Sequence, residues 1–299
     1  MLNRRHVLTV TAALAVLMAA GPAAAQEKLK VLATFSILGD FVRNVGGDRI
    51  ELATLVGPNS DAHVYAPAPA DAKKVADAKV VFTNGLGYEG WMSRLVKASG
   101  SKAPLVVATK GVKERQAQGG HGHGGADPHA WQSVANAKVY VANIRDALVS
   151  ADPAGKAAYE ANAKAYLDKL DTLDKDVKAA VTAIPADRRK VISTHDAFGY
   201  FQQAYGVEFI APQGVSTEAE PSARDVARII TQVKKQKIPA VFLENITDAR
   251  LMQRIAQESG ARIGGKLYSD ALTDEKGDAP SYIELMRHNI KTLSAALMS

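Results

Sequence analysis

Three of the seven histidines in this chain of 299 residues stand at places where a ligand could be bound. His63 and His195 each come after a predicted strand, and His129 lies just before a predicted helix. Asp270 closely follows another predicted strand. Ligands of open α/β sheets bind beyond the carboxyl ends of the strands, so we expect these four side chains to converge.

Neutral imidazole nitrogens and one carboxylate form a four-ligand set that suits Zn²⁺. Asp61, Asp127 and Asp196 each lie close in sequence to one of the three histidines, where a carboxylate could hold a ring N–H. The sequence leaves open which of these acids does so. Spacing alone also fits histidines that only form structural hydrogen bonds, because the chain has no HExxH or CxxC motif.

Three further histidines lie apart from this set. His121 and His123 belong to the tract QAQGGHGHGG at 116–125, whose composition predicts a mobile loop. They are either plain loop residues or an auxiliary site of weak metal capture. His288 falls on a predicted helix, where we expect it at the surface or in packing.

The rest of the chain alternates short β-branched runs with helical patterns. This alternation predicts two α/β lobes, each a mostly parallel four-stranded sheet with flanking helices. The predicted strands lie at 30–35, 50–56, 80–83, 105–108, 190–194, 207–210, 240–243 and 262–268. The predicted helices lie at 37–45, 89–97, 134–149, 221–237, 248–259 and 280–297.

A single long helix is predicted between the two lobes, at 152–184. Asp152 and Pro153 are typical of a helix start, and Pro185 ends the pattern. Apolar residues then recur every three or four positions, which places them on one helix face. We therefore divide the chain into a lobe at 26–151, this connecting helix, and a lobe at 185–299.

The amino-terminal segment and the charge balance limit the function further. Residues 1–25 predict a cleaved signal peptide, with Arg4 and Arg5 before a short apolar run and the cut before Gln26. The paired arginines leave open whether export is general or twin-arginine. The chain has no cysteine, which excludes disulfides. Without the signal the net charge is +4, with both signs mixed and no basic stripe, which argues against nucleic acid as a partner.

Six motifs together resemble the metal-specific solute-binding proteins of ABC importers, the zinc and manganese family called cluster A-I. The resemblance covers essentially the whole mature chain. The motifs are DAHVYAPAP at 61–69, DPHAW at 127–131, THDAFGYF at 194–201, GVSTEAEPS at 214–222, FLEN at 242–245 and LYSDAL at 267–272.

The resemblance implies two α/β lobes joined by one long rigid helix, with a metal site between the lobes. It implies the ligands His63, His129, His195 and Asp270, and it matches a short version of the family's His-containing loop to 119–125. Family members often have a glutamate where this chain has Ala66, but that glutamate is not a usual ligand. The implied function is capture of zinc in the periplasm by a monomer, which delivers it to a permease and its ATPase.

Several alternatives stay open at this point. Manganese is one, although family members that favour manganese often carry glutamate where this chain has His195, and a third imidazole favours zinc. A secreted zinc hydrolase is another, with Glu218, Glu220 or Glu244 as general base, although we interpret these acids as structural or surface residues. A binding protein for a metal chelate or vitamin, an adhesin and a metal-storage protein fit the motifs less well. Asp270 is our candidate for a movable ligand, because it precedes a polar stretch at 273–278.

Overall fold

The computed structural model describes residues 27–117 and 125–298. The predicted signal peptide at 1–25, His121 and His123 therefore lie outside the described residues. In the part that is described, no helix is long and apolar enough to cross a membrane.

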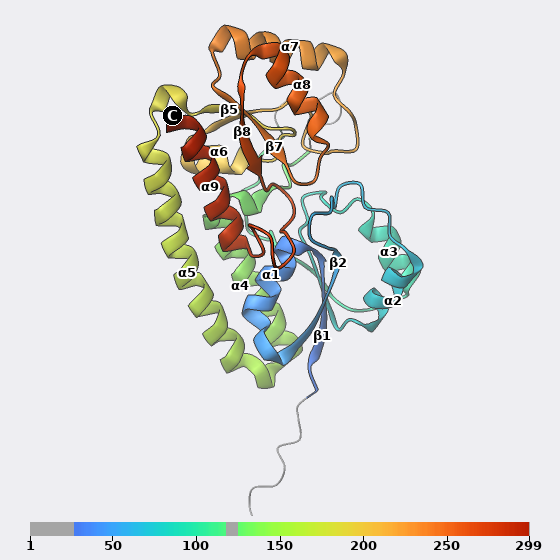
Figure 1. Cartoon of the computed structure of the whole chain (residues 1–299). Coiled ribbons are helices and arrows are strands. Elements are labelled where there is room, and N and C mark those ends of the chain that lie inside the picture. Colours follow the sequence, from blue (N-terminus) through green and yellow to red (C-terminus); the bar gives the residue numbers. More distant parts are fainter. Residues whose placement is uncertain (1–26, 118–124, 299) are drawn as a thin grey trace, which may run out of the picture.

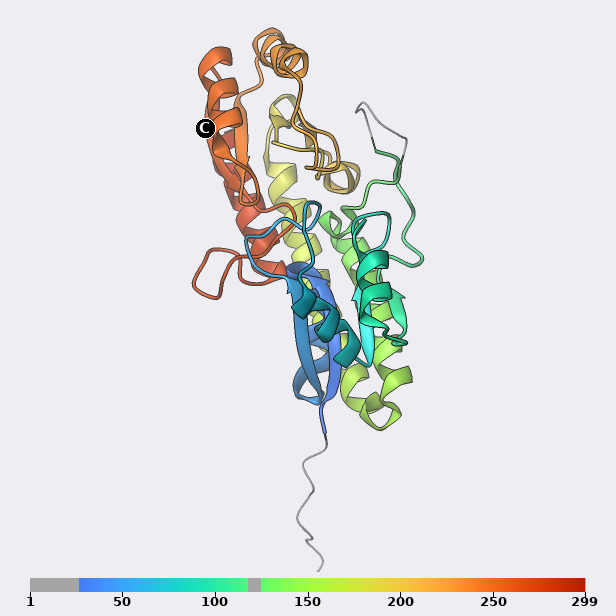
Figure 2. The same ribbon diagram turned by 90° about the vertical axis from the view of Figure 1, so that its right-hand side faces the viewer.

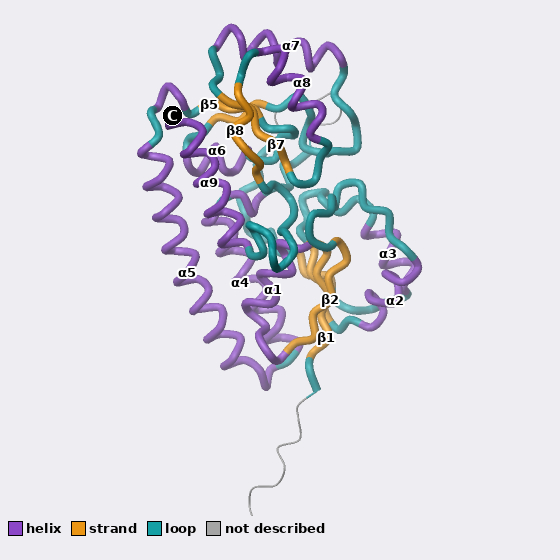
Figure 3. Tube along the Cα trace, in the orientation of Figure 1, coloured by secondary structure: helices purple, strands orange, loops and turns teal. Residues whose placement is uncertain are grey.

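Two four-stranded sheets form the framework, and every strand pair in them is parallel. The sheets are separate and stacked along the length of the molecule, as the strands in Figure 3 show. Their strand orders, β2-β1-β3-β4 and β6-β5-β7-β8, follow the same pattern. This confirms the predicted fold class. The strands are β1 (Leu29–Phe35), β2 (Ile50–Val56), β3 (Val80–Thr83), β4 (Leu105–Val107), β5 (Lys190–Ile192), β6 (Glu208–Ile210), β7 (Ala240–Glu244) and β8 (Arg262–Leu267).

Helices surround both sheets, and two of them were not predicted from the sequence. These are the short helices α2 and α6. Helix α2 begins at Pro69, and the side chain of Asp71 accepts the N–H of Ala68. Helix α6 has only seven residues. The helices are α1 (Ser36–Gly46), α2 (Pro69–Asp77), α3 (Met92–Ser99), α4 (Val134–Ala151), α5 (Lys156–Ala183), α6 (Gly199–Tyr205), α7 (Ala223–Gln236), α8 (Ala249–Ser259) and α9 (Tyr282–Met298).

The long helix α5 runs beside both sheets (Figure 1). Its 28 residues follow a 3-10 turn at Pro153–Gly155 and span about 42 Å at about 1.5 Å per residue. One face of the helix is buried along its whole length, from Tyr159 to Val181. Because this face packs on elements that precede and follow it in the chain, α5 fixes the two sheets relative to each other.

The last helix begins beside α1 in the first lobe and runs back along β8 of the second sheet. Tyr282, the first residue of α9, packs against Phe41 of α1 with 4.7 Å between ring centroids. Its N–H donates to Asp40, and its hydroxyl donates to the carbonyl of Trp131. One hydrophobic cluster therefore includes residues of both sheets, such as Phe82 and Phe242.

The carboxy-terminal elements lie above the amino-terminal ones, as the view turned by 90° also shows (Figure 2). A second, smaller hydrophobic cluster packs α7 and α8 against β7. The division into 26–151, 152–184 and 185–299 stays a proposal, because the larger core is continuous through all three parts.

We predict that truncating the buried face of α5 destabilises the whole protein. Leu170 is 0% exposed, so Leu170→Ala should lower the free energy of unfolding by about 2–5 kcal/mol. Urea unfolding of the metal-free protein measures this loss. Leu167→Ala, at a partly buried position of the same helix, is the control and should lose clearly less. Equal losses would contradict the assignment of the buried face.

Candidate metal centre

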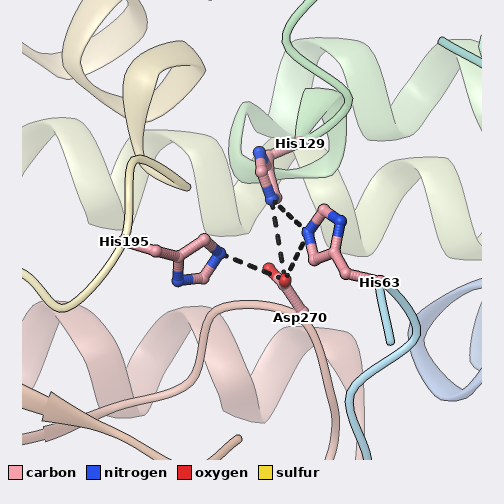
Figure 4. A group of neighbouring side chains, drawn as sticks. All are labelled: His63, His129, His195 and Asp270. Atoms are coloured by element: carbon pink, nitrogen blue, oxygen red, sulfur yellow. Dashed lines mark hydrogen bonds and ion pairs between the residues drawn. The ribbon is translucent and has the colours of Figure 1, made fainter. Parts of the chain in front are cut away.

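The four predicted side chains meet between the two sheets (Figure 4). His63 comes from the loop after β2, and His129 comes from the turn before α4. His195 follows β5, and Asp270 follows β8. One nitrogen of each histidine and one carboxylate oxygen all lie within 4.8 Å of one another. The convergence expected from strand ends is therefore present.

Four of the separations between these atoms are close to those expected around a small tetrahedral ion. Nε2 of His63 lies 3.2 Å from Nε2 of His129 and 3.2 Å from Oδ2 of Asp270. The same oxygen lies 3.6 Å from Nε2 of His129 and 3.2 Å from Nε2 of His195. Ligands at about 2.0–2.1 Å from a tetrahedral zinc ion are separated by about 3.3–3.4 Å.

Polar atoms that point into this centre lack hydrogen-bond partners. Both carboxylate oxygens of Asp270 and Nε2 of His195 are buried and make no hydrogen bond of good geometry among the described residues, although Oδ2 lies in ion-pair distance of the histidines. Buried polar atoms are nearly always paired in native proteins, and a cation bound between these groups would satisfy them. The donor set and its unpaired atoms fit a divalent metal.

A second carboxylate holds the ring of His129. Oδ1 of Asp127 lies 2.9 Å from Nδ1 of His129 and also accepts its backbone N–H at 3.0 Å. The guanidinium of Arg115 donates to the other oxygen of Asp127 at 2.7 Å. Such a partner fixes the ring so that Nε2 faces the metal. Of the three acids near histidines in sequence, Asp127 is therefore the one that reaches a ring nitrogen.

The carboxylate of Glu244 holds the ring of His195, as Asp127 holds that of His129. The sequence analysis did not predict this contact. Its Oε2 lies 2.6 Å from Nδ1 of His195, while Oε1 accepts the backbone N–H groups of Thr194 and His195. Glu244 ends β7, the neighbour of β5 in a parallel sheet, so its place beside the end of β5 could have been inferred. Glu218 and Glu220 are exposed, as expected.

Asp61 and His288 have other contacts. Asp61 accepts the backbone N–H of His63, so it does not hold that ring. His288 lies on α9, where its Nε2 is 3.0 Å from the carbonyl oxygen of Lys266, in agreement with a packing role.

Hydrogen bonds hold the backbone on both sides of Asp270. The carbonyl of Ser269 accepts hydrogen bonds from Trp131 and Gln132 at 2.9 and 2.7 Å. The N–H of Leu272 donates to the hydroxyl of Ser36 at 3.0 Å. These contacts fix the backbone near Asp270, and the expectation that Asp270 is the movable ligand stays a prediction.

The electrostatics of the centre favour protons on two histidines when no metal is bound. Burial opposes a charge on His129, but Asp270 and Asp127 outweigh it and raise the pKa of His129 to about 9. Burial likewise opposes a charge on His195, but Glu244 and Asp270 raise its pKa well above the usual value. Burial lowers the pKa of His63. Burial would raise the pKa of Asp270, but His129 and His195 hold it well below the usual value.

Comparisons with known proteins agree with this geometry. Residues 31–296 match the family described as zinc-uptake complex component A, periplasmic. The chain is 36% identical over 271 residues to the manganese-binding lipoprotein MntA of Halalkalibacterium halodurans, covering 91% of this chain and 89% of that protein. It is 34% identical over 273 residues to the iron-binding protein YfeA of Yersinia pestis, covering 91% and 88%.

A solved structure shares the whole architecture. The periplasmic zinc-binding protein TroA of Treponema pallidum superimposes with a TM-score of 0.85 at 30% identity, covering 91% of this chain and 99% of that one. The similar proteins are thus named for three different metals.

We predict that metal binding releases protons and strengthens as the pH rises. His129 and His195 are protonated below their raised pKa values, and both must lose the proton to bind a metal. The affinity should rise with pH through about pH 9, where His129 loses its proton, with release of about two protons near pH 7. Calorimetry in buffers of different ionisation enthalpy counts these protons. Release of none would contradict the charge balance described above.

We also predict that Glu244→Gln weakens metal binding although Glu244 is not one of the four converging groups. The amide keeps the size of the side chain but removes the negative charge beside His195, and such changes weaken binding by about 10–100-fold. Competition with a chelator of known affinity measures the change. Glu258→Gln, at an exposed position of α8 that pairs with Arg254, is the matched control. Equal affinity of the two variants would show that the charge of Glu244 does not strengthen metal binding by His195.

Proposed function

This chain belongs to the cluster A-I family of metal-specific solute-binding proteins of ABC importers, and we propose that it captures zinc outside the cytoplasm and delivers it to such an importer. Its partners in this proposal are the membrane permease and the ATPase that drives import. The members of the family are binding proteins and not enzymes, which sets the hydrolase alternative aside. We further propose that the chain acts as a monomer after cleavage before Gln26.

The observation that carries the proposal is the buried group of four ligand atoms, three histidine nitrogens and one oxygen of Asp270. We propose that His63, His129, His195 and Asp270 bind the ion together. The four side chains are 0–8% exposed and their ligand atoms lie within 4.8 Å of one another, which suits a single ion better than an organic chelate. Three imidazoles and one carboxylate make a softer set than manganese prefers, and zinc stands above manganese in the affinity order of divalent ions.

A manganese carrier is the second candidate, and one feature of the site favours it. The second oxygen of Asp270, Oδ1, is also buried and has no hydrogen-bond partner among the described residues. If both oxygens bound the ion, the coordination number would rise to five, beyond the four ligands usual for zinc. Manganese accepts more ligands and more oxygen than zinc does.

The proposal predicts tight zinc binding that depends on His195. The metal-free protein from Gln26 should bind a single zinc ion with a Kd on the order of nanomolar, which is about −12 kcal/mol. His195→Ala should lose most of this affinity, because it removes a ligand and leaves Glu244 without its partner. Calorimetric titrations with zinc and with manganese measure both.

The outcomes separate the candidates. His288→Ala removes a histidine outside the site and should bind zinc as the parent does. Manganese bound as tightly as zinc would favour a manganese importer. Failure to bind either metal would overturn the site and the proposed function together.

A further inference from the structure

The loop at 57–65, here called the ligand loop, carries His63 across to the other sheet. The backbone N–H of Asn59 donates to the carbonyl of Leu272 at 2.8 Å. The amide of Asn245 donates to the side chain of Asn59 at 3.2 Å. Asn59 has φ of 53°, a left-handed conformation that asparagine tolerates better than most residues. The tip of the ligand loop is therefore fixed to segments that follow β7 and β8.

Asp61 makes the contact nearest to the metal centre. One oxygen of Asp61 accepts the backbone N–H of His63 at 2.8 Å. The other oxygen accepts the hydroxyl of Thr217 at 2.5 Å, 156 residues away in sequence. Thr217 is itself positioned by Gln213, whose amide donates to the carbonyls of Thr217 and Ala219. One carboxylate thus fixes the backbone at His63 and ties it to the segment that follows β6.

The way into the centre passes His63. His63 is 8% exposed, whereas His129, His195 and Asp270 are each 0% exposed. The contacts of those three come from Asp127, Glu244 and Ser269, which are all buried. The ligand loop has exposed residues at its tip and is tied to the second sheet chiefly by single polar contacts. Because the sheets share one core, opening this loop disturbs less packing than separating the sheets.

We propose that Asp61 and Thr217 form a latch that holds His63 over the metal, and that opening of this latch sets the rate of metal release. They are positioning residues, because neither offers an atom to the ion. The inference rests on the proposed function, since it takes the metal to be bound by these four side chains. It locates the moving part in one loop and leaves the relation of the two sheets unchanged.

The test is the rate at which zinc leaves the loaded protein after mixing with excess EDTA. Thr217→Val keeps the shape of the side chain and removes the hydroxyl, so the dissociation rate should rise about ten-fold, as for loss of a hydrogen bond to a charged group. Thr217→Ser restores the hydroxyl and should bring the rate back to about that of the parent. Thr231→Val, the same change on the exposed face of α7, is the matched control.

A double-mutant cycle separates a latch from a general structural effect. Thr217→Val should add less than about two-fold to the rate when Asp61 is already alanine, because the partner is gone. Asn245→Ala removes the neighbouring contact to Asn59 and should raise the rate about three-fold, which gives an independent variant if Thr217→Val does not fold. Thermal unfolding of each metal-free variant checks the fold.

Unchanged release from a folded Thr217→Val, or an effect that persists fully in Asp61→Ala, would overturn the latch while metal binding stands. If Thr217→Val does not fold, release from Asn245→Ala at the rate of the parent overturns it. Failure of the parent to bind zinc would overturn the proposed function, and the latch with it.

Discussion

The structure depends on the balance of charge buried between its two sheets. Asp127, Glu244 and Asp270 are three carboxyl groups that are 0–4% exposed. Among the described residues the one fixed cation that pairs with them is Arg115. An unbalanced charge is costly in an interior of low dielectric. With neutral histidines, three carboxylates and one guanidinium leave a net charge of −2, which the +2 charge of a divalent ion would balance. The raised pKa values of His129 and His195 have the same cause, because protons on these two histidines balance the buried negative charge when no metal is bound.

The fold holds most of the four converging groups in place, whether protons or a metal ion balance the buried charge. α5 packs against α1, α4 and α9, and α9 begins beside Phe41 and runs along β8, so the framework has one continuous core. Three of the four metal-facing groups are attached to that core by buried carboxylates or backbone contacts. A carrier must bind tightly and still release its cargo. Motion confined to the loop of His63, as proposed above, would leave the other three groups in place while the ion is released.

The sequence was sufficient for the framework and for the four converging side chains, and the reasons are local. Strand periodicity places His63, His195 and Asp270 after strand ends, where ligands of open α/β sheets bind. The six motifs together are specific enough to identify the family. The partner of His195 was missed because Glu244 lies 49 residues from it, and only the order of strands brings them together. The restraint on Asp270 was missed for the same reason, since Trp131 and Ser36 belong to other elements.

The choice of metal follows from how firmly the coordination shell is held. A rigid shell with four donors at tetrahedral separations disfavours ions that need five or six ligands, because extra donors must come from residues that cannot move. Here the carboxylate of Asp270 could supply a fifth donor without any motion of the chain, since Oδ1 already lies buried beside Oδ2 with no hydrogen bond of its own among the described residues. In the proposed site, the choice between zinc and manganese would depend both on the three imidazoles and on whether this carboxylate binds through one oxygen or two. The contacts of Ser269 and Leu272 fix the backbone on either side of Asp270 and so limit how far its carboxylate can turn.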